Sequence, residues 1–136
     1  MTEPEIGYID YSTMNVDKNA SYDSLKDRVV LITGAGQAIG RGYAHYFSAQ
    51  GAIPIVADIN GENAKNVARE IEENQGKAMA VQVDVADEQS NIDMVDKVLA
   101  KYGRLDVLIN NAAIFSQITM APFWELPVDE WKRAVD

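Results

Sequence analysis

The strongest chemical signal in the sequence is a glycine-rich segment, residues 33–40, which reads Thr-Gly-Ala-Gly-Gln-Ala-Ile-Gly. It lies between an apolar run, residues 28–33, and a segment with apolar residues at helical spacing, residues 39–50. A turn without bulky side chains lets backbone N–H groups and a helix N-terminus face a pyrophosphate. Glycines also serve as plain turn residues, so the segment alone leaves a structural role open. The spacing is not G-x-G-x-x-G, because Ile39 stands where that pattern needs its last glycine.

Asp58 is the second candidate, because it follows the apolar run of residues 53–57. Its distance from Gly40 is close to the interval of about 20 residues that separates the glycine turn from an acidic residue in dinucleotide-binding proteins. A carboxylate there accepts hydrogen bonds from the adenosine ribose and repels a 2′-phosphate, which favours NAD over NADP. The alternative is that Asp58 or Asn60 caps the helix predicted to follow. The glycine turn upstream favours the nucleotide interpretation.

Two more polar groups follow predicted strands. Asp84 and Val85 come after residues 78–83, and the sequence Asn-Asn-Ala-Ala, residues 110–113, comes after residues 105–109. Taken alone, Asp84 suits a turn or a helix cap, and the asparagines suit an Asx-type turn. Parallel strands bring their carboxyl ends to one edge of a sheet, where open α/β folds bind ligands. The joint pattern therefore indicates one binding site.

The elements that would position these residues alternate along the chain. Short β-branched runs predict strands at 28–33, 53–57, 78–83 and 105–109, and apolar periodicity predicts helices at 39–50, 60–74, 88–102 and from 128. This alternation predicts an α/β fold, a Rossmann-type doubly wound parallel sheet that is incomplete, with strand order 3-2-1-4 and helices on both faces. We assign residues 27–136 to this NAD-binding domain and interpret residues 1–26 as a polar arm or disordered leader.

Composition excludes several classes of protein. The 136 residues carry 12 Lys plus Arg against 21 Asp plus Glu, a net charge of −9, which argues against binding to nucleic acid. There is no cysteine and a single histidine, His45, so neither a disulfide framework nor a Cys- or His-rich metal site is expected. The acidic start does not resemble a signal peptide, and no apolar run is long enough to span a bilayer. We expect a cytoplasmic protein that does not enter membranes.

Together these motifs resemble those of the short-chain dehydrogenases/reductases. Residues 33–40 are similar to the TGxxxGxG turn of that family, Asp84 falls where its adenine-contacting aspartate follows the third strand, and residues 110–113 are similar to its NNAG motif. Two positions depart from the pattern, because Ala38 and Ala113 stand where the family has glycine. Alanine is tolerated at such a position if the backbone φ is not positive.

The resemblance implies a binding role for each matching residue. Backbone groups of the turn would surround the pyrophosphate, Asp58 would hold the adenosine ribose, Asp84 and Val85 would border the adenine, and the residues after the fourth strand would lie along the cofactor. The implied cofactor-binding residues are Gly34, Gln37, Ala38, Ile39, Gly40, Asp58, Asp84, Val85, Asn111 and Ala112.

The resemblance also implies an activity, namely hydride transfer between NAD(H) and a small alcohol or ketone. The family uses an Asn, a Ser and a Tyr-x-x-x-Lys pair, and none of these can be assigned in this sequence. We therefore expect the chain to be the cofactor-binding half of an enzyme that is a homodimer or homotetramer when complete, and to be inactive alone. Two alternatives stay open: a non-catalytic dinucleotide-binding module, and a fragment that folds too poorly to bind. An S-adenosylmethionine enzyme would share the strand, the glycine turn and the acidic residue, but the motif at residues 110–113 favours the dehydrogenase.

Some local predictions concern residues outside the motifs. His45 has no partner that the sequence can place, and the acidic residues within 70–73 read as a solvated helix face. Trp131 is predicted to point inward, and residues 123–126 are predicted to pack on the helix that follows them. The strand at 105–109 is predicted to be an exposed apolar edge.

Overall fold

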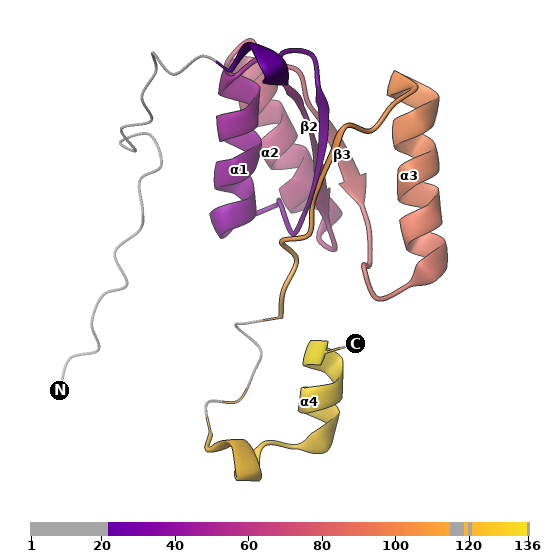
Figure 1. The fold of residues 1–136 in the computed structure, drawn as a ribbon. Coiled ribbons are helices and arrows are strands. Elements are labelled where there is room, and N and C mark those ends of the chain that lie inside the picture. The colour runs from indigo at the N-terminus through magenta and orange to yellow at the C-terminus, as the bar shows by residue number, and fades with distance from the viewer. Residues whose placement is uncertain (1–21, 115–118, 120, 136) are drawn as a thin grey trace, which may run out of the picture.

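A computed structural model describes residues 22–114, 119 and 121–135 of the chain. It contains a four-stranded parallel sheet in the order β3-β2-β1-β4 (Figure 1). The strands are β1 (Val29–Thr33), β2 (Ile53–Asp58), β3 (Met79–Gln82) and β4 (Val107–Ile109). The helices are α1 (Ala38–Ala49), α2 (Gly61–Glu73), α3 (Glu88–Tyr102) and α4 (Val128–Val135). The predicted fold class and strand order are confirmed.

The two central strands are completely buried, as their continuous apolar sequences predict. Every residue of β1 and of β2 is buried, because helices cover both faces of the sheet. Helices α1 and α2 lie on one face and α3 lies on the other (Figure 1). The first face packs around Val30, Ile32, Val56, Ala44, Val67 and Ile71, and the second around Val29, Leu31, Ile55, Val81, Met94 and Val98.

The ends of α2 and α3 are fixed by local hydrogen bonds. Asn60 caps α2, since its side chain accepts from the amides of Glu62 and Asn63 at 3.1 Å. Asp87 caps α3 in the same way, and Gly103 ends that helix in the left-handed conformation. Helix α1 differs, because its N-cap residue Gln37 makes no side-chain capping bond.

Residues 22–26 of the predicted arm contain a short 3-10 helix, Asp23–Leu25. The chain then enters the sheet through Asp27, whose amide donates to the carbonyl of Gly51 at 2.8 Å. The rest of the arm, residues 1–21, lies outside the described residues.

The prediction that the acidic residues within 70–73 form a solvated face of α2 is wrong for Glu70. Glu70 is only half-exposed, and its Oε2 accepts from Arg41 Nε at 2.8 Å and lies 2.9 Å from His45 Nε2. Burial raises the pKa of Glu70, but hydrogen bonds and charge from Arg41 and His45 outweigh it and hold the pKa below its ordinary value. His45 therefore has a partner, which the sequence could not place because α1 and α2 meet only in the fold.

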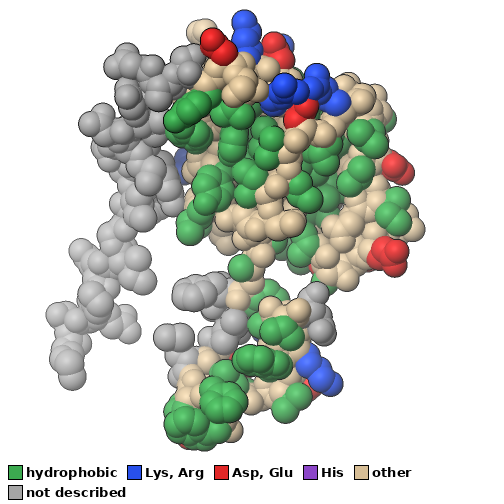
Figure 2. Space-filling view, in the orientation of Figure 1, with side chains coloured by type: hydrophobic (Ala, Val, Ile, Leu, Met, Phe, Trp, Pro, Cys, Tyr) green, Lys and Arg blue, Asp and Glu red, His purple; other side chains and the backbone are tan. Residues whose placement is uncertain are grey.

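The predicted packing of the aromatic residues near α4 is also wrong. Phe123 and Trp124 are each 75% exposed, and Trp131 is 57% exposed. Hydrophobic side chains gather on the surface of this segment (Figure 2). The periodicity correctly predicts the helix, but burial depends on a covering surface that the described residues do not provide.

The strand β4 forms one edge of the sheet beside β1. Leu108 in this strand is 53% exposed, which agrees with the predicted apolar edge. Among the described residues, no helix combines the length and the apolar character that crossing a membrane requires.

Candidate functional site

The turn after β1 packs directly against the segment that follows β4. Gly34 has a φ of +64°, and a Cβ there would lie 2.9 Å from the Cα of Ala112. A Cβ on Gly40 would lie 2.3 Å from the carbonyl oxygen of Gly34 and 2.7 Å from Nδ2 of Asn111. Both positions therefore require glycine, because an added side chain would push the two segments apart.

Thr33 and Asn111 lock these two segments together. Thr33 Oγ1 accepts from the amides of Asn111 at 3.1 Å and Ala112 at 3.0 Å, and Thr33 is 4% exposed. The side-chain Nδ2 of Asn111 donates back to the carbonyls of Thr33 at 2.9 Å and Gly34 at 3.3 Å. The Asn111 side chain thus holds the start of the glycine turn through two backbone carbonyls. Thr33 was absent from the predicted site residues, although its place at the head of the TGxxxGxG-like motif could have pointed to it.

Asp58 joins the same turn to the end of β2. Its Oδ2 accepts from the amide of Gly36 at 2.8 Å, and its Oδ1 accepts from the amide of Asn60 at 2.9 Å. The side chain is 7% exposed, and no Lys or Arg of the described residues forms an ion pair with it. Because each carboxylate oxygen has two lone pairs, acceptor capacity remains at both oxygens.

The structure decides whether Asp58 or Asn60 caps the helix α2. Asn60 is the cap of α2, whereas Asp58 bonds to the Asn60 amide ahead of the helix and to the turn after β1. The Asp58 carboxylate thus connects the end of β2 to the turn that follows β1.

The first turn of α1 is open to solvent. Gln37, Ala38 and Ile39 are exposed, and Ile39 reaches 64%. Ala38 has a φ of +46°, so the condition for a strain-free alanine fails at this departure from the glycine pattern. Ala113, the other departure, does not have a positive φ. The α1 amides have no capping bond from the side chain of Gln37.

Asp84 and Val85 lie in the loop after β3, and both are exposed. Asp84 Oδ1 accepts from the amide of Ala86 at 3.0 Å, and the Asp84 amide donates to Ser90 Oγ at 3.0 Å. These bonds give Asp84 the turn role that its residue type also suits. The Val85 side chain remains 47% exposed and offers an apolar surface.

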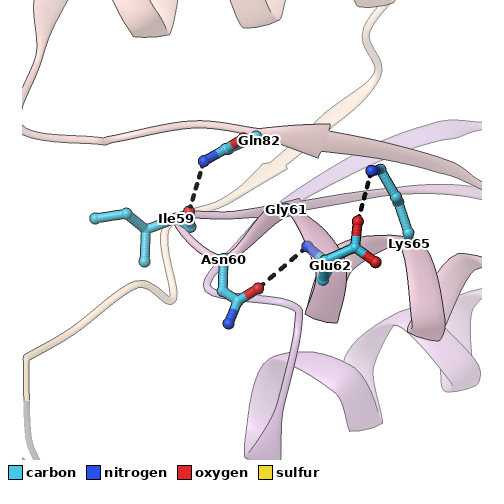
Figure 3. Close-up of a pocket in the computed structure, with 6 residues that line it drawn as sticks. All are labelled: Ile59, Asn60, Gly61, Glu62, Lys65 and Gln82. Carbon is cyan, nitrogen blue, oxygen red and sulfur yellow. Dashed lines mark hydrogen bonds and ion pairs between the residues drawn. The ribbon is translucent and has the colours of Figure 1, made fainter.

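A hollow of about 460 Å³ opens next to Asp58, at the ends of β2 and β3 (Figure 3). None of the predicted site residues lines it, although Ile59 and Asn60, which come directly after Asp58 in the chain, do. Its lining residues are Ile59, Asn60, Gly61, Glu62, Lys65 and Gln82. Lys65 Nζ lies 2.7 Å from Glu62 Oε1, and this contact lowers the pKa of Glu62.

The described residues offer binding groups and no evident acid–base catalyst. They contain no group of three or more His, Cys, Asp or Glu residues that could hold a metal ion. Partial burial and the neighbouring Tyr22 raise the pKa of Tyr46, which is the wrong direction for a tyrosine that must ionise during a reaction. Backbone amides near a helix N-terminus, a carboxylate and an apolar surface along one sheet edge can hold a nucleotide.

Comparisons with known proteins connect this geometry to a family. The family model described as short chain dehydrogenase matches residues 28–136. The chain is 40% identical over 107 residues to a meso-2,3-butanediol dehydrogenase of Serratia marcescens, which covers 79% of this chain and 41% of that protein. It is 35% identical over 112 residues to a 7alpha-hydroxysteroid dehydrogenase of Escherichia coli, with 82% of this chain and 42% of that protein covered.

A solved structure shows the same fold. The crystal structure of a hydroxysteroid dehydrogenase from Escherichia coli superposes with a TM-score of 0.72 at 35% identity, over 80% of this chain and 45% of that one. The matched part of the chain therefore covers less than half the length of these relatives.

Proposed function

The chain belongs to the short-chain dehydrogenase family, and from that premise we propose that it is the NAD(H)-binding part of an oxidoreductase acting on a small alcohol or ketone. The observation that carries this proposal is the Asp58 carboxylate, which holds the glycine turn at Gly36 and keeps spare acceptor capacity at the end of β2. Proteins of this family use NAD or NADP.

The pyrophosphate would lie in front of α1. The supporting observation is that α1 lacks the side-chain cap present on α2 and α3, so its first amides and its positive dipole end remain available to an anion. Gly34 and Gly40 keep the turn compact, and Gln37, Ala38 and Ile39 form its solvent side.

The adenosine ribose would lie at Asp58. Its buried, unpaired negative charge disfavours the 2′-phosphate of NADP, and its remaining lone pairs suit the two ribose hydroxyls of NAD. Lys65, the nearest lysine along the chain, is paired with Glu62 and does not offset this charge. NAD is therefore the proposed cofactor.

The segments after β3 and β4 complete the proposed site. Val85 offers an apolar surface to the adenine, with Asp84 shaping the loop that carries it. Asn111 and Ala112 lie against the glycine turn, so Asn111 acts by holding that turn in place. The bound nicotinamide would supply or accept the hydride.

The proposed reaction is oxidation of an alcohol or reduction of a ketone. The two relatives support this class, because both are named as dehydrogenases of hydroxyl compounds. We assign no catalytic residue within the described part of the chain. Since the relatives are more than twice the length of the matched stretch, we propose that turnover requires residues other than these 136.

A competition titration tests the proposal. NADH fluorescence should change saturably on addition of the 136-residue chain, and ADP-ribose should displace NADH nearly as well as NAD does, because every proposed contact is to the adenosine and pyrophosphate. AMP should displace it much less well. No saturable signal, or displacement by nicotinamide mononucleotide but not by ADP-ribose, would overturn the proposal.

A further inference from the structure

The hollow next to Asp58 is closed on one side by Gln82, the last residue of β3 (Figure 3). Gln82 is the register partner of Asp58 in the parallel pair of β2 and β3. Its side-chain Nε2 donates to the carbonyl oxygen of Ile59 at 3.1 Å. The edge strand therefore holds the backbone of the residue that immediately follows Asp58.

Gly61 shows how closely this side chain packs on the turn. A Cβ on Gly61 would lie 3.0 Å from Gln82 Oε1 and 3.2 Å from its Cβ and Cδ. Gly61 is the first residue of α2, and its φ is not positive, so the backbone conformation itself does not demand glycine. A Cβ at Gly61 would therefore require the Gln82 side chain to move by a few tenths of an ångström.

The turn held by Gln82 is tied to the Asp58 carboxylate. Next in the chain after Ile59, Asn60 donates its amide to Asp58 Oδ1, while Gly36 donates to Oδ2. If the turn at Ile59 and Asn60 moved, the Asn60 amide would lose its hydrogen bond to Asp58 Oδ1. The carboxylate would then be held only by the amide of Gly36 and could change its orientation.

We propose that Gln82 is a positioning residue that fixes the orientation of the Asp58 carboxylate and thereby sets the discrimination between NAD and NADP. This inference rests on the proposed function, because it assumes that Asp58 faces the ribose. The role belongs to Gln82 and not to Lys65, which lines the same hollow but contacts Glu62 and not the Ile59 carbonyl.

The first test compares the dissociation constants of NADH and NADPH for the wild-type chain, Gln82→Ala and Gln82→Met. Losing one neutral hydrogen bond changes an equilibrium by about fivefold. We expect the NADPH-to-NADH ratio of dissociation constants to fall by about that factor in both variants, while urea denaturation remains a single cooperative transition. Gln89→Ala is the matched control, because it removes another exposed glutamine whose amide donates to Asp93 on α3. It should leave the ratio unchanged.

A double-mutant cycle separates the positioning effect of Gln82 from a general loss of structure. Gly61→Ala alone should lower the NADPH-to-NADH ratio of dissociation constants, because the added Cβ would displace the Gln82 amide. In the Gln82→Ala background the contacts with Oε1 and Cδ are gone, so the same substitution should have a smaller effect. Fully additive effects would contradict the inference.

Amide exchange supplies a readout that needs no cofactor. The Asn60 amide, which donates to Asp58, should exchange about fivefold faster in Gln82→Ala and at the wild-type rate in Gln89→Ala. Failure of the wild-type chain to bind NADH would overturn the proposed function and the ribose role with it. NADH binding with an unchanged ratio and unchanged Asn60 exchange in Gln82→Ala would overturn the Gln82 inference alone.

Discussion

The amide of Gly36 donates a 2.8 Å hydrogen bond to Oδ2 of Asp58 and so connects the turn after β1 to the end of β2. One buried carboxylate therefore orders the segment proposed to face the pyrophosphate and presents the oxygens proposed to face the ribose. This double use predicts that changes at Asp58 affect both stability and binding.

Asp58→Ala should lower the free energy of unfolding by about 2 kcal/mol, because it leaves the Gly36 and Asn60 amides without their acceptor. Urea denaturation at neutral pH measures this change. Asp58→Asn keeps one acceptor oxygen and should lose less. A free energy of unfolding that is unchanged in Asp58→Ala would show that the carboxylate does not hold the turn.

Thr33→Val should destabilise the chain by about 2 kcal/mol while keeping the shape of the side chain. It removes the hydroxyl that accepts from the amides of Asn111 and Ala112 in a buried position. Thr33→Ser keeps that hydroxyl and should retain most of the stability. A larger loss in the serine variant than in the valine variant, measured by urea denaturation, would point to packing of the methyl group as the cause.

Ala38→Gly should stabilise the chain by about 1 kcal/mol, because Ala38 has a positive φ that glycine adopts without steric cost. Ala113→Gly is the matched control: it restores the other family glycine at a position without a positive φ and should give no gain. Thermal melts of the two variants beside the wild type make the comparison. A similar gain in both would argue against strain at Ala38.

Acid should destabilise the fold through Asp106. Hydrogen bonds from Arg104, the Val29 amide and Arg28 lower the pKa of Asp106 from 3.8 to about 2. Since the pKa is depressed in the folded state, the stabilisation is present above about pH 4 and is lost as the pH falls toward 2. Asp106→Asn should therefore flatten the dependence of unfolding on pH between 4 and 2. Asp96→Asn, an exposed position on α3, should leave that dependence as in the wild type.

The fold, and the sheet edge at which the candidate site residues lie, could be predicted from the sequence because both depend on local pattern. Continuous apolar runs such as β1 and β2 predict buried parallel strands, and parallel strands necessarily bring their carboxyl ends together. The glycine turn follows β1 and Asp58 ends the neighbouring strand β2, so their proximity follows from topology alone.

The remaining features depend on contacts between distant segments. The ion pairs of Glu70 arise where α1 and α2 pack, and the Gln82 bond to Ile59 depends on the register of β3 against β2. The positive φ of Ala38 is set by the whole turn and not by its residue type. The exposure of Trp131 reflects the absence of a covering element among the described residues, which helical periodicity does not report.

The most direct test of the central claim is the pair of dissociation constants for NADH and NADPH, measured by fluorescence titration of the wild-type chain, Asp58→Ala and the surface control Asp96→Ala. The wild type and the control should bind NADH about tenfold more tightly than NADPH, because the Asp58 charge opposes the 2′-phosphate. In Asp58→Ala the two constants should lie within about twofold of each other. Equal binding of both cofactors by the wild type, or an unchanged ratio in Asp58→Ala, would contradict the assignment of Asp58 to the ribose.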